Sequence, residues 1–181
     1  MIAFLYVFSV FALLIFLMLV FLYITTHLIS SVIGVPFVKT PKDELETIFL
    51  GCEISHRSHF FELGSGTAAI ARHINHQFGC KVTAIEANPA LHFVARLQNW
   101  HAKQPQIGLI HGDAFQADLS TATHVYFFML PEFSRKIADK LQNECKKGTV
   151  IITYGFKIPQ LSPGLIRTLT TTKFSVFYYR L

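Results

Sequence analysis

The stretch His59-Phe-Phe-Glu-Leu-Gly-Ser-Gly-Thr-Ala-Ala69 decides the fold of this 181-residue chain. Its apolar start leads into an acid, Glu62, and then into the turn Gly64-Ser-Gly66, after which helix-forming residues begin. A second apolar run ends in another acid, Glu86, 20 residues after the second glycine. A strand, a glycine turn, a helix and a second strand in this order build a nucleotide pocket at the carboxyl ends of two neighbouring parallel strands.

The rest of the chain continues this alternation of strands and helices. Apolar runs rich in β-branched and aromatic residues mark further strands, and amphipathic runs mark the helices between them. Such alternation is typical of a parallel sheet with helices on both faces. The expected strands are 59–63, 81–86, 107–111, 124–130 and 149–154, and the expected helices are 42–50, 67–78, 89–102 and 132–146.

The C-terminal tail departs from the alternation. Residues 155–164 have a loop-like composition, whereas 165–171 and 173–179 are rich in strand formers with almost nothing between them. They predict an antiparallel hairpin at one edge of the sheet, in place of the usual helix and parallel strand. The expected fold class is therefore α/β, a Rossmann-like, mostly parallel sheet of seven strands closed by an antiparallel hairpin.

The N-terminal segment is an apolar run of a different kind. Residues 1–24 contain no charged side chain and consist mostly of Leu, Ile, Phe and Val. As a helix they would span about 36 Å, enough to cross a hydrocarbon core of about 30 Å. A cleaved signal peptide is the alternative, but no basic residue precedes the run and no small-residue cleavage site follows it. We expect a transmembrane helix over 1–26, a membrane-proximal connector over 27–41 and one domain over 42–181.

Charge is confined to the C-terminal part of the chain. The net charge of +5 belongs to the residues after Val38, and Lys39 and Lys42 flank the membrane exit. This placement favours a domain on the cytoplasmic side, or on the matrix side of an organelle. The basic residues form no long run, so we expect anionic lipid near the domain and no nucleic acid partner. The three cysteines and nine histidines lack metal-ligand spacing, so we expect no metal site.

Two ligands suit the glycine turn, a dinucleotide and S-adenosylmethionine. Gly64-Ser-Gly-Thr-Ala-Ala69 satisfies the loose dinucleotide pattern, and Glu86 is available for a ribose in either case. Glu62 favours S-adenosylmethionine, because a carboxylate before the turn would repel a pyrophosphate and suits the cationic amino group of a methionine moiety. After the third strand, Asp113 can accept from an adenine amine while Phe115 packs against the ring.

Three segments resemble the first three motifs of class I S-adenosylmethionine-dependent methyltransferases: Glu62-Leu-Gly-Ser-Gly-Thr67, Ala84-Ile-Glu-Ala-Asn-Pro-Ala-Leu91 and His111-Gly-Asp-Ala-Phe115. With the apolar N-terminus and the segment Val35-Pro-Phe-Val-Lys-Thr-Pro41, the chain more narrowly resembles the membrane-anchored protein-lysine methyltransferases of the FAM173 type. The resemblance covers roughly residues 35 to 160. One departure is Ala68, at a point where the turn of the family usually continues with glycine.

The resemblance implies a role for each matching residue, with S-adenosylmethionine as the cofactor. Glu62 would contact its methionine part, Glu86 would hold both ribose hydroxyls and Asp113 would read the adenine. The full expected cofactor site is Thr40, Glu62, Gly64, Ser65, Gly66, Glu86, Ala87, Asn88, Asp113, Ala114 and Phe115. The expected lining on the side of the methyl acceptor is Phe37, Met129, Leu130 and Pro131.

The function implied is methylation of a lysine in a membrane-associated protein. No residue stands out as a catalytic base. Two alternatives stay open: methyl transfer to a lipid or quinone-like molecule, and a cofactor-binding scaffold without catalysis. The expected fourth strand ends in Met129-Leu130, and Pro131 follows it; no Asn-Pro-Pro-Tyr motif comes after it, which argues against methylation of a nucleobase or a glutamine amide.

Overall fold

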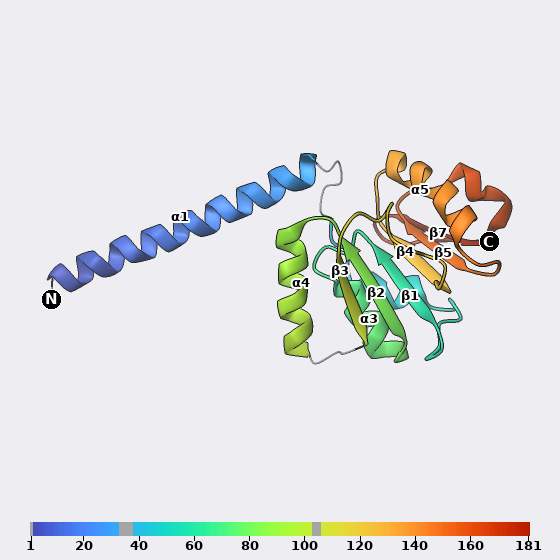
Figure 1. Ribbon diagram of the computed structural model, residues 1–181, viewed down its shortest axis with the longest axis horizontal. Coiled ribbons are helices and arrows are strands. Elements are labelled where there is room, and N and C mark those ends of the chain that lie inside the picture. Colours follow the sequence, from blue (N-terminus) through green and yellow to red (C-terminus); the bar gives the residue numbers. More distant parts are fainter. Residues whose placement is uncertain (1, 33–37, 103–105) are drawn as a thin grey trace. The chain divides into compact units, whose positions relative to one another are not determined.

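The structure, a computed structural model, describes residues 2–32, 38–102 and 106–181 (Figure 1). The chain divides into two compact units, Met1–Phe37 and Val38–Leu181, which we describe separately.

The first unit is one long helix, α1 (Ile2–Val32). Within it, Ala3–Thr25 is long and apolar enough to cross a membrane, by length and composition alone. The helix continues past residue 26, where we expected the transmembrane segment to end, and residues 33–37 of the expected connector lie outside the described residues. The division into membrane segment, connector and domain stays a prediction.

The second unit is built on one sheet of seven strands in the order β3-β2-β1-β4-β5-β7-β6. Strands β1 to β5 run parallel, and β7 lies antiparallel between β5 and β6. Because β2 and β4 pair with opposite sides of β1, the order reverses there, and ligands of such sheets bind at the carboxyl ends of strands beside this switch point. The strands are β1 (His59–Leu63), β2 (Lys81–Glu86), β3 (Ile107–His111), β4 (His124–Phe127), β5 (Val150–Tyr154), β6 (Leu165–Thr170) and β7 (Ser175–Arg180).

Apolar clusters cover both faces of this sheet. Successive side chains of a strand point to opposite faces, so Phe60 joins one buried cluster and Phe61 the other. The Phe60 face carries η1 (Lys42–Glu44), α2 (Leu45–Phe49), α3 (Ala69–Phe78) and α4 (Pro89–Ala102). The Phe61 face carries α5 (Pro131–Glu144) and η2 (Pro159–Gly164).

The expected fold class, with its antiparallel C-terminal hairpin, is confirmed, and the differences lie at element ends. β4 ends at Phe127, three residues earlier than expected, because Pro131 starts α5 and Leu130 already serves as its N-cap. α3 starts at Ala69 and not at Thr67, because Ala68 has a left-handed backbone with φ of 55°. The helix missing between β5 and β6 is replaced by the short 3-10 helix η2.

A buried carboxylate ties the start of this unit to its C-terminal hairpin. Glu44 in η1 is 4% exposed. It accepts hydrogen bonds from the hydroxyls of Tyr154 on β5 and Thr171 after β6, and from the backbone N–H of Lys173 at 3.2 Å. Burial raises the pKa of Glu44, but these hydrogen bonds outweigh it, so the pKa lies below its ordinary value. The ionised carboxylate thus connects segments far apart in sequence.

We expect Glu44→Gln to lower the free energy of unfolding by about 2 kcal/mol near pH 7, because hydrogen bonds to a charged group contribute more than those to a neutral one. The folded pKa is depressed, so this contribution is present above the ordinary value of 4.5 and is lost as the pH falls through the folded pKa. Urea unfolding of both proteins at neutral and acidic pH measures it. Glu46→Gln, at an exposed site in α2, is the control. A deficit in Glu44→Gln that is the same at both pH values would contradict the assignment.

Candidate functional site

The turn that joins β1 to α3 is built from left-handed backbone. Gly64 and Gly66 have φ of 67° and 56°, values that only glycine adopts without strain. A side chain on Gly64 would also lie 3.2 Å from the terminal methyl of Met129, in the segment after β4. The glycines therefore let the backbone of the turn approach that segment closely.

Ala68 ends the turn as the N-cap residue of α3, with φ of 55° and its methyl group fully buried. A methyl group accepts no hydrogen bond, so this residue cannot cap the helix. The carboxylate of Glu62, on β1, instead accepts a hydrogen bond from the backbone N–H of Ala71 at 2.9 Å. A strand residue thus supplies the acceptor that a side chain at the N-cap usually provides.

Glu62 is buried, and its environment opposes ionisation. Burial raises its pKa to about 8, the hydrogen bond from Ala71 and the charge of Arg72 lower it, and the nearby Glu86 raises it further. Its parallel-strand register partners are Ala84 and Tyr126, so Glu62 lies between β2 and β4, directly below the turn. A cation placed here would favour the ionised carboxylate.

Glu86, at the end of β2, holds the same turn from the other side. Its two carboxylate oxygens accept hydrogen bonds from the N–H of Gly66 at 2.6 Å and of Asn88 at 2.8 Å. Burial raises its pKa, and hydrogen bonds from Asn88, Gly66 and Ala87 act in the opposite direction. A carboxylate has about four acceptor positions, so capacity remains for a hydroxyl donor.

Ser65 lies between these carboxylates in the turn. Its backbone N–H donates to the carbonyl of Ile85 at 2.9 Å, which joins the turn to β2. Its hydroxyl is buried and, among the residues that the structure describes, has no hydrogen-bond partner. Buried polar groups are rarely left unpaired, so this hydroxyl fits a site that takes a polar ligand.

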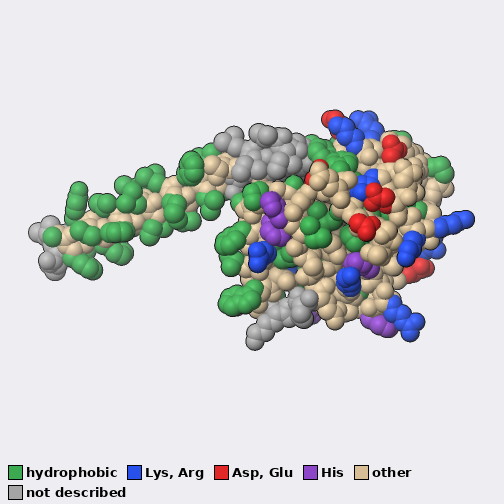
Figure 2. Space-filling model, in the orientation of Figure 1, with side chains coloured by type: hydrophobic (Ala, Val, Ile, Leu, Met, Phe, Trp, Pro, Cys, Tyr) green, Lys and Arg blue, Asp and Glu red, His purple; other side chains and the backbone are tan. Residues whose placement is uncertain are grey.

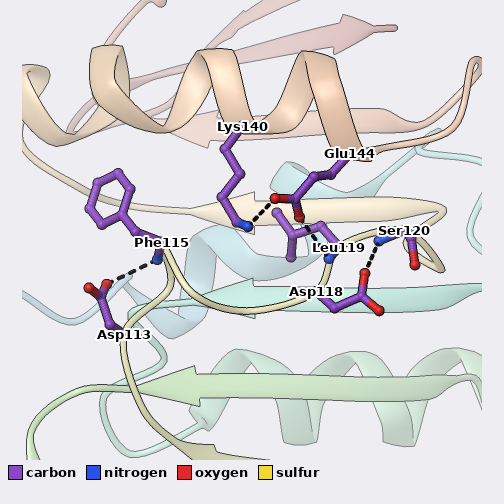
Figure 3. A network of polar contacts seen from close by, with 7 residues as sticks. All are labelled: Asp113, Phe115, Asp118, Leu119, Ser120, Lys140 and Glu144. Carbon is purple, nitrogen blue, oxygen red and sulfur yellow. Dashed lines mark hydrogen bonds and ion pairs between the residues drawn. The ribbon is translucent and has the colours of Figure 1, made fainter.

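The loop after β3 brings Asp113 close to the end of β2, but Asp113 is exposed, whereas Glu62 and Glu86 are buried. His111 pairs in register with Glu86, and its ring lies 3.1 Å from the carbonyl of Ala87. Asp113 is exposed and accepts a hydrogen bond from the N–H of Phe115 at 2.9 Å, as Figure 3 shows. Ala114 is buried beneath this turn. The adenine role of Asp113 stays a prediction.

The same loop is fixed to α5 and borders a hollow in the sheet. Glu144 on α5 accepts from the N–H of Leu119 at 3.4 Å and pairs with Lys140 (Figure 3). A hollow of about 280 Å³ opens beside this loop, on the face of the sheet opposite Glu62. Its lining is Phe61, Thr83, Ile85, Ile110, Gly112, Asp113, Gln116, Ala117 and Asp118.

The residues expected on the acceptor side lie at the end of β4. Met129 is buried beside Gly64, whereas Leu130 is 40% exposed and Pro131 begins α5. The hydroxyl of Thr40 lies 2.9 Å from that of Tyr126, the register partner of Glu62, so Thr40 reaches the same strand ends. Phe37 lies outside the described residues.

An aromatic cluster at the ends of β4 and β5 was not predicted. Phe128 lies 4.8 Å from Tyr154 and 5.4 Å from Phe174, measured between ring centroids, and Tyr154 lies 5.4 Å from Phe174. A side chain on Gly155 would come within 2.9 Å of the Phe128 ring, so glycine is required there. The sequence held one signal, because Phe128 and Tyr154 lie near the ends of two expected strands, 124–130 and 149–154.

Comparison with known proteins gives this arrangement a context. A family model described as the ANTKMT methyltransferase domain matches residues 62–164. A protein of Saccharolobus islandicus named protein-lysine N-methyltransferase is 25% identical over 140 residues, which cover 74% of this chain and 84% of the relative.

Solved structures share the fold. An RNA methyltransferase from Salinibacter ruber in complex with S-adenosyl-L-homocysteine superposes with a TM-score of 0.74 and 25% identity, covering 79% of this chain and 93% of that one. A precorrin-6y C5,15-methyltransferase from Geobacter metallireducens has a TM-score of 0.64 and 14% identity, with coverage of 78% and 88%, and shows the likeness in fold alone.

The family match spans more than half of the chain and begins at Glu62, the acid that precedes the glycine turn. The buried carboxylates and the unpaired Ser65 hydroxyl suit a cofactor with a cationic part and ribose hydroxyls. The chain therefore belongs to the ANTKMT methyltransferase domain family, of the FAM173 type, and is a class I methyltransferase that uses S-adenosylmethionine.

Proposed function

We propose that this chain is a membrane-anchored protein-lysine methyltransferase that modifies a membrane-associated protein. Membership of the ANTKMT methyltransferase domain family is the observation that carries the proposal, and the Saccharolobus relative named protein-lysine N-methyltransferase supports it. The apolar segment Ala3–Thr25 supports the anchor. The domain then faces the cytoplasm, or the matrix if the membrane is that of an organelle.

In this proposal the cofactor lies along the ends of β1, β2 and β3. Glu86 binds the ribose hydroxyls with the acceptor capacity that its backbone partners leave. Glu62 stabilises the cationic methionine part, and the Ser65 hydroxyl gains a partner. Asp113 reads the adenine. The remaining expected contacts are Thr40, Gly64, Gly66, Ala87, Asn88, Ala114 and Phe115.

The methyl acceptor is assigned to the ends of β4 and β5. S-adenosylmethionine supplies a methyl group on a positively charged sulfur, and a lysine attacks it only as a neutral amine. Met129 and Leu130, with the rings of Phe128 and Phe174, provide apolar surroundings there. Removing the amine from water lowers its pKa, and alignment within about 3 Å of the methyl group provides most of the remaining acceleration. We assign no side chain as catalytic base.

The anchor has a kinetic role. A helix in the bilayer confines the domain near the membrane surface and so raises its effective concentration toward acceptors in the same membrane. A lipid or quinone-like acceptor would gain from the same tether, and a scaffold that only binds the cofactor would need no acceptor. The RNA methyltransferase among the structural neighbours makes RNA a further acceptor to test.

We expect Glu86→Gln to weaken binding of both S-adenosylmethionine and S-adenosylhomocysteine by about ten- to a hundredfold, because hydrogen bonds to a charged acceptor contribute about 1.5–3 kcal/mol. Isothermal titration calorimetry of the detergent-solubilised full chain measures the change. Glu46→Gln, which removes an exposed carboxylate of α2, should bind as the wild type does. Unchanged affinity in Glu86→Gln would show that the pocket is elsewhere.

The pKa of Glu62 predicts a pH dependence. Its folded pKa of about 8 lies above the ordinary 4.5, so its contribution to the stability of the cofactor-free protein is complete below pH 4.5 and is lost as the pH rises through 8. A cation beside Glu62 favours the ionised form, so the rise in melting temperature caused by S-adenosylmethionine should grow between pH 6 and pH 8.5. In Glu62→Gln this growth should vanish. Parallel pH profiles in the two proteins would refute the placement of the cation beside Glu62.

The acceptor class is tested by label transfer. The full chain is incubated with S-adenosylmethionine labelled in its methyl group and with membranes from cells that lack the gene, and label is then measured separately in protein, lipid and RNA. We expect label in protein, released as methyllysine on hydrolysis, and about ten- to a hundredfold less with the Glu86→Gln enzyme when the cofactor is subsaturating. Label confined to lipid or to RNA would reassign the acceptor, and cofactor binding without transfer to any fraction would favour the scaffold.

A further inference from the structure

Helix α4 has one buried face and one apolar face that no described residue covers. Leu91 and Ala95 are buried against the sheet. On the other side Phe93, Leu97 and Trp100 are 60%, 51% and 80% exposed. These three residues, the α4 outer face, follow the spacing i, i+4, i+7 and so form one stripe along the helix. Figure 2 shows apolar side chains standing out from the side of the domain where Figure 1 places α4.

Helix α4 itself carries no acidic side chain. The stretch from Ala87 to Gly112 contains no Asp or Glu, and α4 itself carries Arg96 and two histidines. A helix with an apolar stripe, a tryptophan, basic residues and no acids is typical of segments that lie in the plane of a membrane interface. Tryptophan rings favour this depth, and basic side chains are attracted to anionic lipid headgroups.

The chain itself brings a membrane within reach. This step rests on the anchor proposed above, in which Ala3–Thr25 crosses the bilayer. The helix continues to Val32, about 10 Å further along its axis. Six peptide steps then lead to Val38, where the second unit starts, and even a fully extended chain covers only about 20 Å in them. A bilayer is therefore the surface that this domain meets at the highest effective concentration.

We propose that the α4 outer face is a second membrane contact, which enters the interfacial layer of the anionic bilayer that holds α1. Phe93, Leu97 and Trp100 bury their side chains among headgroups and upper acyl chains, and Arg96 pairs with lipid phosphates. α4 begins at Pro89, directly after the Glu86–Asn88 segment of the cofactor site. The contact therefore fixes how the carboxyl ends of the strands face the membrane, which attachment through the N-terminal helix alone would not do.

Trp100 reports on this contact directly, because it is the only tryptophan of the chain. The full chain is reconstituted into vesicles of phosphatidylcholine and phosphatidylserine, with and without lipids brominated high on their acyl chains. We expect the emission of Trp100 in the vesicles to lie at shorter wavelength than that of the protein in detergent at low ionic strength. Aqueous iodide should no longer quench this emission, and the brominated lipids should quench it. If iodide still quenches the fluorescence of Trp100 and the brominated lipids do not, the proposal is overturned.

Two variants separate the contact from general effects of reconstitution. Phe93→Ser combined with Leu97→Ser should restore iodide quenching of Trp100 and abolish quenching by bromine. Ile166→Ser is the matched control, because Ile166 is a 54% exposed apolar residue on β6, the edge strand opposite β3. It should behave as the wild type does, and an equal loss in this variant would contradict a specific role of α4.

The remaining outcomes distinguish this inference from the anchor and from self-association. Extraction of the wild type from vesicles by alkaline carbonate would refute the anchor and, with it, this inference. A protein that resists carbonate but keeps Trp100 open to iodide would refute the α4 contact alone. A second copy of the chain would be shown to cover this face by two results together. Trp100 would stay protected from iodide in detergent and lose this protection on dilution, and light scattering would detect a dimer.

Discussion

The cofactor side of this domain depends on two buried carboxylates that hold one turn. Glu62 from β1 binds the Ala71 N–H at the start of α3, and Glu86 from β2 binds the Gly66 N–H inside the turn. Burial raises the pKa of both acids, and the charge of Glu86 raises that of Glu62 further. The partial positive charge of the α3 N-terminus offsets only part of this cost. In the proposed function, this pair of carboxylates is arranged in advance for a cation with hydrogen-bond donors.

At Ala68, several small and opposing contributions to the free energy of folding nearly balance. A left-handed backbone costs an L-residue about 1–2 kcal/mol, and Ala68 has φ of 55°. Glycine would remove that strain, but it would give the unfolded chain more freedom, at about 0.4–1 kcal/mol, and would remove a fully buried methyl group worth about 0.8 kcal/mol. The terms nearly cancel, which explains how alanine is tolerated where the family pattern has glycine. The capping bond from Glu62 does not depend on which of the two residues is present.

Local sequence signals carried most of the fold, whereas the roles expected for the site residues stay predictions. Strand and helix periodicity placed the elements, and the expected helix 67–78 ends at Phe78, before Gly79 with its left-handed backbone. Glu62 and Glu86 were expected to bind a cofactor, and the structure adds that both hold the glycine turn. Interactions between distant segments gave no such signal. Nothing local connects Glu44 with Tyr154 and Thr171, more than a hundred residues away. The aromatic cluster at the acceptor side was missed for the same reason, because its rings come from three separate segments.

The side chains on the two sides of the switch point differ in character, and this difference is relevant to a reaction for which we assign no catalytic base. Glu62 and Glu86 lie at the ends of β1 and β2, whereas aromatic side chains lie at the ends of β4 and β5, where Tyr154 donates a hydrogen bond to the carboxylate of Glu44. In the proposed reaction a lysine approaches a cofactor that already carries a positive charge. Two like charges about 4 Å apart repel by about 4 kcal/mol at an effective dielectric constant of about 20, which corresponds to a fall of about 3 units in the lysine pKa. That fall brings an amine with an ordinary pKa of about 10.4 close to neutral pH. With the cofactor bound, its charge would leave much of the lysine neutral near pH 7, with the proton released to water, so that methyl transfer would need no side-chain base.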